Sequence, residues 1–157
     1  MDLRARAGGI VGRVALGIAL SLLASSCGAL RFNRAWSSYE PADGRSAMEG
    51  RWRGEWRSEW NGHSGGLRCV MTRDDEGDDY RAWFYSTYAS LLFFQHRTLF
   101  RVTAREGEAL RFEGDEDLGK AIGGVYRYEG TVEGDSFRAE FHAENGDHGV
   151  MEMRRVE

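Results

Sequence analysis

The chain has 157 residues, which allows one folded domain and a tail but not two full domains. Its hydrophobic fraction of 41% is enough for a packed core and argues against a wholly disordered chain. The formal net charge of −4 argues against a protein that attracts nucleic acid or anionic lipid through its overall charge. The chain contains 21 glycines and a single proline, a composition typical of strands joined by tight turns.

Residues 1–26 have the three parts of a secretory signal peptide. Three arginines stand near the start, an uncharged apolar run covers 14–26, and small residues lead up to Cys27. The apolar run is too short to span a bilayer, which takes about 20 residues. Removing 1–26 takes away the three arginines and one aspartate, so the net charge of the remaining chain becomes −6. We therefore predict an exported, acidic mature protein.

The end of this segment, "LLASSC" at 22–27, resembles the lipobox of bacterial lipoprotein signal peptides. The resemblance implies that Cys27 becomes the lipid-modified first residue and anchors the protein in the cell envelope, on the periplasmic or outer-membrane face. Ala24 stands where leucine is commonest in that motif. The alternative is ordinary cleavage after Ser26, because Ala24 and Ser26 are both small.

Residues 27–48 show no sustained hydrophobic period and contain the only proline, Pro41. We predict that they form the lipidated cysteine and a flexible tether. An extra strand around 32–36 is the alternative. If Cys27 carries lipid, Cys69 has no disulfide partner, and we expect it to be buried as a small hydrophobic residue.

The segment "GRWRGEWRSEW" at 50–60 places Trp52, Trp56 and Trp60 four residues apart. A helix here would carry Gly54 in its interior and only a narrow tryptophan stripe. In a strand, every even position from 52 to 60 is Trp, Gly or Ser and every odd position is charged. This alternation with a period of two predicts a strand.

Seven further runs alternate in the same way, at 67–71, 80–85, 100–103, 110–113, 126–132, 137–143 and 149–155. Glycine-containing turn signals at 105–108, 133–136 and 145–149 separate several of them. A sheet of this length must close or double over to protect its edges. We therefore predict an all-β fold, a single antiparallel up-and-down β-barrel of about eight strands occupying residues 49–157.

A G-x-W motif occurs at 50–52 and again at 54–56, and an arginine stands in the last predicted strand. This arrangement resembles the calycins, the lipocalin-like and fatty-acid-binding-protein-like barrels, over 50–157 in outline. The resemblance implies that a tryptophan plugs one end of the barrel and that a late arginine packs across it. The positions that match these roles are Trp52 or Trp56 and Arg154 or Arg155.

An eight-stranded barrel can be filled by its own side chains or can hold one small ligand. The calycin resemblance implies a small apolar or amphipathic ligand, and Gly54, Gly130 and Gly149 on the inward face would leave space for it. The alternative is an envelope structural or protein-interaction module with a filled barrel. The predicted ligand-binding residues are Trp56, Phe84, Tyr126, Tyr128, Phe141 and Arg155.

No catalytic or metal-binding motif stands out in the sequence. The four histidines, at 63, 96, 142 and 148, lack ligand spacing such as H-x-x-x-H, and we interpret them as surface or turn residues. The acidic run at 74–79 lacks the order of an EF-hand, and Ser64 has no strand–turn–helix context. We predict no enzyme activity, no metal, no cofactor and no nucleic-acid partner, and nothing indicates the oligomeric state.

The apolar segment 91–94, "LLFF", interrupts the alternation. It could form a lid helix over the barrel mouth, a loop that touches a membrane, or a buried connection. We favour the buried connection, because soluble proteins rarely leave such patches exposed.

The lipobox predicts that radiolabelled palmitate enters the wild-type protein in a bacterial host and does not enter Cys27→Ala. Two or more acyl chains on one cysteine would give stable anchoring, whereas one chain alone is marginal. Equal labelling of the two proteins would contradict lipidation at Cys27.

Overall fold

The computed structural model describes residues 28–41, 46–74, 77–88 and 92–156. They fall into two units that divide between Ser37 and Ser38. The first contains a helix over 28–37, and the second contains the barrel. The predicted signal peptide and Cys27 lie outside the described residues. Within the described ranges, no helix has both the length and the apolar character needed to cross a membrane.

The helix over 28–37 stands where we predicted a flexible tether, and the prediction was wrong for these residues. The segment contains good helix formers such as Ala29, Leu30 and Arg31. Phe32 and Trp36 are four residues apart, one helical turn, and their ring centroids lie 6.0 Å from each other. The same two aromatic residues had suggested a strand as the alternative.

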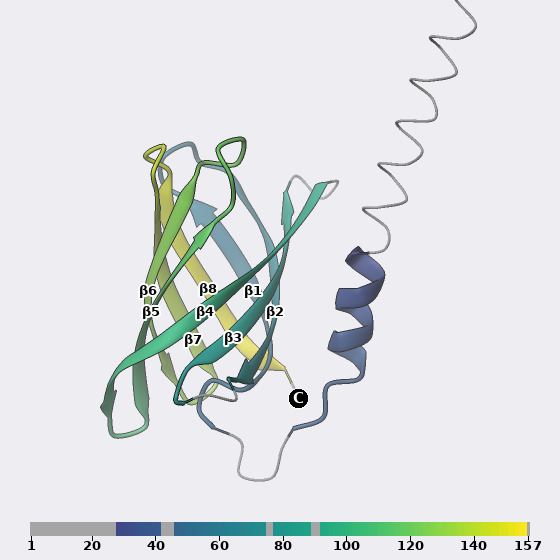
Figure 1. Cartoon of the computed structure of the whole chain (residues 1–157), viewed down its shortest axis with the longest axis vertical. Coiled ribbons are helices and arrows are strands. Elements are labelled where there is room, and N and C mark those ends of the chain that lie inside the picture. The colour runs from purple at the N-terminus through teal and green to yellow at the C-terminus, as the bar shows by residue number, and fades with distance from the viewer. Residues whose placement is uncertain (1–27, 42–45, 75–76, 89–91, 157) are drawn as a thin grey trace, which may run out of the picture. The chain divides into compact units, whose positions relative to one another are not determined.

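The prediction of a closed eight-stranded antiparallel barrel is confirmed (Figure 1). Each strand pairs antiparallel with the next, and β8 pairs antiparallel with β1, so the barrel has no free edge. The strands are β1 (Gly50–Ser58), β2 (Ser64–Arg73), β3 (Tyr80–Tyr88), β4 (Leu92–Glu106), β5 (Ala109–Asp117), β6 (Val125–Glu133), β7 (Ser136–Ala143) and β8 (His148–Val156).

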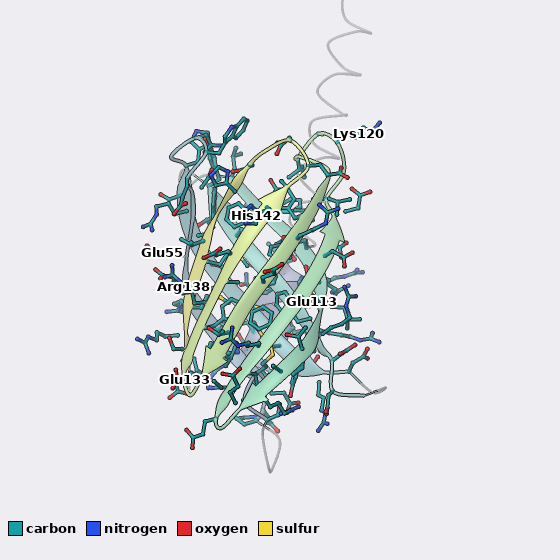
Figure 2. The ribbon with its side chains drawn as sticks, turned by 90° about the vertical axis from the view of Figure 1, so that its left-hand side faces the viewer. Glu55, Glu113, Lys120, Glu133, Arg138 and His142 are labelled. Atoms are coloured by element: carbon teal, nitrogen blue, oxygen red, sulfur yellow. The ribbon has the colours of Figure 1, made fainter. Side chains whose placement is uncertain are left out.

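Alternation decides which side chains face the interior. In β7, for example, Phe137, Ala139 and Phe141 are buried, whereas the residues between them are exposed. Charged residues cover the outer wall, where Figure 2 labels Glu55, Glu113, Arg138 and His142. Cys69 is a free, fully buried cysteine of the core.

One end of the barrel, called here the closed end, is plugged by Trp52, whose side chain is fully buried. The guanidinium carbon of Arg155 lies 4.3 Å from the centre of the Trp52 ring. The indole nitrogen of Trp52 donates a hydrogen bond of 2.9 Å to the carbonyl oxygen of Met48. Arg155 also donates to the carbonyl oxygens of Ala47 and Glu49. Trp52 and Arg155 thus occupy the two roles that the calycin resemblance implied.

These contacts extend the barrel domain by a few residues beyond its predicted start at 49. Met48 is completely buried and belongs to the core. Glu49 accepts hydrogen bonds from the backbone nitrogens of Ser46 (3.1 Å) and Arg73 (3.3 Å). Residues 46–48 are therefore part of the plug.

Next to the plug, aromatic rings fill the interior. The ring centroids of Phe100 and Phe112 are 4.6 Å apart, and those of Phe112 and Phe137 are 5.1 Å apart. Phe112 also covers Gly130, where an added Cβ would lie 2.6 Å from the Phe112 ring. Gly130 therefore leaves no open space, contrary to our expectation, and this part of the barrel is solid.

The buried position of Trp52 predicts that Trp52→Ala lowers the free energy of unfolding by about 3–5 kcal/mol, through lost burial and the cavity left behind. Trp60→Ala is the matched control, because the Trp60 side chain is 55% exposed in the β1–β2 turn. That change should stay within about 0.5 kcal/mol. Urea denaturation followed by circular dichroism measures both, and similar losses would contradict the assignment of Trp52 as the plug.

Candidate functional site: an apolar cavity at the barrel mouth

The opposite end, called here the mouth, is where β1, β3, β5 and β7 end and where β2, β4, β6 and β8 begin. A cavity of about 330 Å³ opens there. Its wall is almost entirely apolar, with contributions from strands all around the barrel. The lining residues are Trp56, Ser86, Thr87, Tyr88, Leu92, Phe93, Phe94, His96, Leu118, Ile122, Tyr126, Tyr128, Phe141, Asp147 and Met151.

The structure brings together four of the six residues predicted to contact a ligand: Trp56, Tyr126, Tyr128 and Phe141 all line the cavity. Phe84 does not line it. Its side chain is fully buried and stacks on the ring of His96, with 4.9 Å between the ring centroids. Phe84 therefore supports a lining residue from behind.

Arg155 is also outside the cavity, because it lies at the closed end, paired with Trp52. The error has a simple cause: alternation shows which face of a strand a residue occupies but not its height in the barrel. Arg155 is one of the last residues of β8, and the antiparallel pairing of β8 with β1 places it beside the beginning of β1. The prediction that Arg155 binds a ligand together with the other five residues is therefore corrected, because Arg155 does not line the cavity.

Trp56 forms a fixed part of the cavity wall. Its indole nitrogen donates a hydrogen bond of 3.0 Å to the carbonyl oxygen of Thr87. Its ring stacks on Tyr88, with 6.3 Å between centroids, and its Cα pairs with that of Met151 on β8. The hydrogen bond and the stacked ring, both on β3, hold the indole in the cavity wall.

His96 is one of the lining residues that sequence reasoning missed, because we interpreted it as a surface or turn residue. Its ring packs between Phe84 and Phe94, with centroid distances of 4.9 and 5.6 Å. Its Nε2 lies 3.4 Å from the Tyr128 hydroxyl, and its Nδ1 is buried without a hydrogen-bond partner among the described residues. Continuing the alternation of β4 from Phe100 back to 98 and 96 would have found it.

A small polar network lies at one edge of the mouth. The Ser58 hydroxyl donates a hydrogen bond of 2.6 Å to Oδ1 of Asp147. The Tyr126 hydroxyl lies 3.0 Å from the carbonyl oxygen of Ile122 and 3.4 Å from Oδ2 of Asp147. The β1 end, the β5–β6 loop and the β7–β8 loop are linked through these four residues.

Burial keeps the titratable rings of the cavity uncharged at neutral pH. It lowers the pKa of His96 to about 4, because charging the imidazole would cost solvation. Burial, with a further contribution from the Asp147 charge, raises the pKa of Tyr126 to about 12. The pKa of Tyr128 is raised well above its usual value by burial first, and then by Tyr126 and Glu116.

Large apolar side chains surround the opening. Leu92, Phe93 and Ile122 are 65%, 38% and 42% exposed, and the exposed Trp60 lies on the loop at the same end. The preferred prediction of a buried connection at 91–94 is therefore wrong for residues 92 and 93, because β4 already begins at Leu92. Leu91 lies outside the described residues.

The other concave surfaces of the barrel are of a different kind. One lies over β5, β6 and β7 on the outer wall and is lined by charged residues such as Arg111, Glu129 and Arg138. Among residues 28–41, 46–74, 77–88 and 92–156, no three His, Cys, Asp or Glu side chains come close enough together to hold a metal ion. The mouth cavity is the concave surface with apolar walls and a few polar groups, the combination typical of small-molecule sites.

Comparisons with protein-family models, with curated proteins and with solved structures found no match. The closed eight-stranded barrel is consistent with a calycin-like fold. The likeness to that superfamily remains a resemblance, carried by the tryptophan and arginine of the closed end. A function has to be inferred from the mouth itself.

The buried imidazole predicts a pH-dependent stability. A histidine with a pKa of about 4 in the folded protein and 6.5 when unfolded binds more protons in the unfolded state between those values. Stability should therefore fall as the pH falls from 6.5 to 4, by up to about 3 kcal/mol from this group. Urea denaturation at several pH values should show that His96→Phe lacks this part of the slope.

His142→Phe is the matched control, because His142 is exposed on the outer wall. It should keep the wild-type slope between pH 4 and 6.5. A wild-type slope in His96→Phe as well would contradict the burial of a neutral His96.

Proposed function

We propose that this protein is a noncatalytic lipoprotein of the bacterial cell envelope whose small barrel binds an apolar or amphipathic small molecule in its mouth. The observation that carries the proposal is the apolar cavity of about 330 Å³. Its volume lies within the range of small-molecule sites, about 300–1,000 Å³. The barrel is solid at its other end, so the wall around the cavity is supported by a packed core.

The envelope part of the proposal is supported by the sequence alone. The signal-like segment 1–26 and the lipobox-like "LLASSC" favour export and lipid attachment at Cys27. The acidic mature chain favours anchoring through lipid over attraction to anionic headgroups. In this proposal the N-terminal lipid holds the protein at the membrane, and the barrel binds a soluble or lipid-derived ligand.

A protein-interaction module is the second candidate, and the exposed side chains around the mouth favour it. Trp60, Leu92 and Ile122 are large, apolar and exposed at one end of an otherwise charged barrel. Exposed apolar patches mark sites of interaction with proteins, membranes or ligands. A module of this kind would not need the cavity behind the rim, which is why ligand binding is the first choice.

Native mass spectrometry of the protein purified from its own envelope tests the proposal. We expect an additional noncovalent mass that is released when the protein is denatured, unlike a lipid bonded to Cys27. Ser86→Trp should abolish this mass, because Ser86 is a small side chain on the cavity wall and an indole there fills the space. Thr131→Trp, on the exposed outer wall, is the matched control and should keep it.

An unliganded mass for the wild-type protein, or retention of the ligand by Ser86→Trp, would contradict the pocket. The interaction module would then be the remaining candidate.

A further inference from the structure

We propose that the ligand of the mouth cavity is an apolar molecule with a cationic amine end held at Asp147, and that the cavity discriminates against carboxylates. The inference rests on the proposed function, since it specifies the chemistry of the ligand. It is the opposite of what the predicted role of Arg155 would imply, because an arginine in the cavity would favour a ligand with an acidic group.

Cations are missing from the described wall of the cavity. Neither lysine nor arginine is among its described lining residues, and Asp147 is the acidic residue among them. Arg155 is at the closed end, where Trp52 and the carbonyl oxygens of the plug hold it. Lys120, on the β5–β6 loop, extends away from the barrel (Figure 2). A carboxylate ligand would thus enter without a counter-charge, which is costly in an apolar site.

One carboxylate oxygen of Asp147, Oδ2, is available to accept a hydrogen bond from a ligand. Its Oδ1 accepts the proton of Ser58 at 2.6 Å. Its Oδ2 has only the Tyr126 hydroxyl at 3.4 Å, and that hydroxyl lies closer, at 3.0 Å, to the carbonyl oxygen of Ile122. A phenol has one proton to donate, and the shorter contact takes it. Among the described residues, no arginine or lysine forms an ion pair with Asp147.

A second carboxylate adds to the negative potential. Glu116 continues the inward alternation of Leu110, Phe112 and Gly114 on β5, and its Cα pairs with that of Tyr126. Burial, followed by the neighbouring charges of Asp115 and Asp117, raises its pKa. Its charge also contributes to the raised pKa of Tyr128 on the cavity wall. The potential of Glu116 therefore reaches the cavity.

The aromatic side chains fit the same ligand. Trp56 and Tyr126 lie in the wall that Asp147 shares, and the faces of aromatic rings attract cations. His96 is neutral, so it contributes hydrogen-bonding capacity but no positive charge. Apolar walls, two carboxylates and uncharged rings together favour a hydrophobic amine over an alcohol, and an alcohol over an acid.

Three ligands with the same ten-carbon alkyl chain test this order of affinities: decylamine, decanol and decanoate. At neutral pH an alkyl amine is protonated and a carboxylic acid is ionised. Binding to the whole protein is measured by isothermal titration calorimetry below the solubility limit of decanol and below the micelle concentrations of the two ionic compounds. It should be about tenfold tighter for decylamine than for decanol. Decanoate should bind more weakly than decanol.

Asp147→Asn keeps the shape of the side chain and its bond to Ser58 but removes the charge. It should weaken decylamine binding about tenfold and leave decanol binding unchanged. Glu116→Gln should weaken decylamine binding by a smaller factor, and it leaves the hydrogen bond between Ser58 and Asp147 in place. Glu140→Gln, on the exposed outer wall, makes the same change in net charge and should have no effect. Circular dichroism checks that each variant is folded.

Decanoate binding as tightly as decylamine would overturn the inference and leave the pocket standing. So would equal losses of decylamine affinity in Asp147→Asn and Glu140→Gln. Failure of all three compounds to bind the wild-type protein would overturn the inference and count against the proposed function as well.

Discussion

The pairing of β1 with β8 is the constraint on which the rest of the structure depends. It removes the free edges of the sheet and fixes a register in which Trp52 stands opposite Arg155. The indole plugs the closed end, the guanidinium covers it at 4.3 Å, and the arginine also binds carbonyl oxygens of residues 47 and 49. A single stacked pair thus joins the first strand, the last strand and the segment that leads into the barrel.

This closure divides the barrel into two parts with different physical roles. Near the plug, Phe100, Phe112 and Phe137 pack at centroid distances of 4.6 and 5.1 Å and leave no space for a ligand. Near the mouth, the wall is still apolar, but it includes the Asp147 carboxylate, the His96 imidazole and the hydroxyls of Tyr126 and Tyr128. The dense aromatic packing lies at one end, and the features that could recognise a small molecule lie at the other.

The sequence predicts the strands and their inward faces well, because most strands alternate along their length, with β4 as the exception. It predicts the site only partly. Arg155 faces inward as expected but at the wrong end, and His96 was overlooked because its strand extends further back than the apolar pattern suggested. Both errors concern height along the barrel axis, which depends on how all eight strands are staggered and which no single run of residues reveals. The helix over 28–37 was missed because its signal, one aromatic pair a turn apart, also fits a strand.

The pairing of β1 with β8 also makes the first and last strands of the barrel domain neighbours, since Arg51 lies opposite Val156. Chain order is therefore not essential to the architecture. If a short linker joined these ends and a mouth loop were opened instead, the same eight strand pairings would be available to the rearranged chain. In such a circular permutant the chain would enter and leave the barrel at the mouth. The closed ring of strand pairings defines the barrel, whichever connection between two strands is left open.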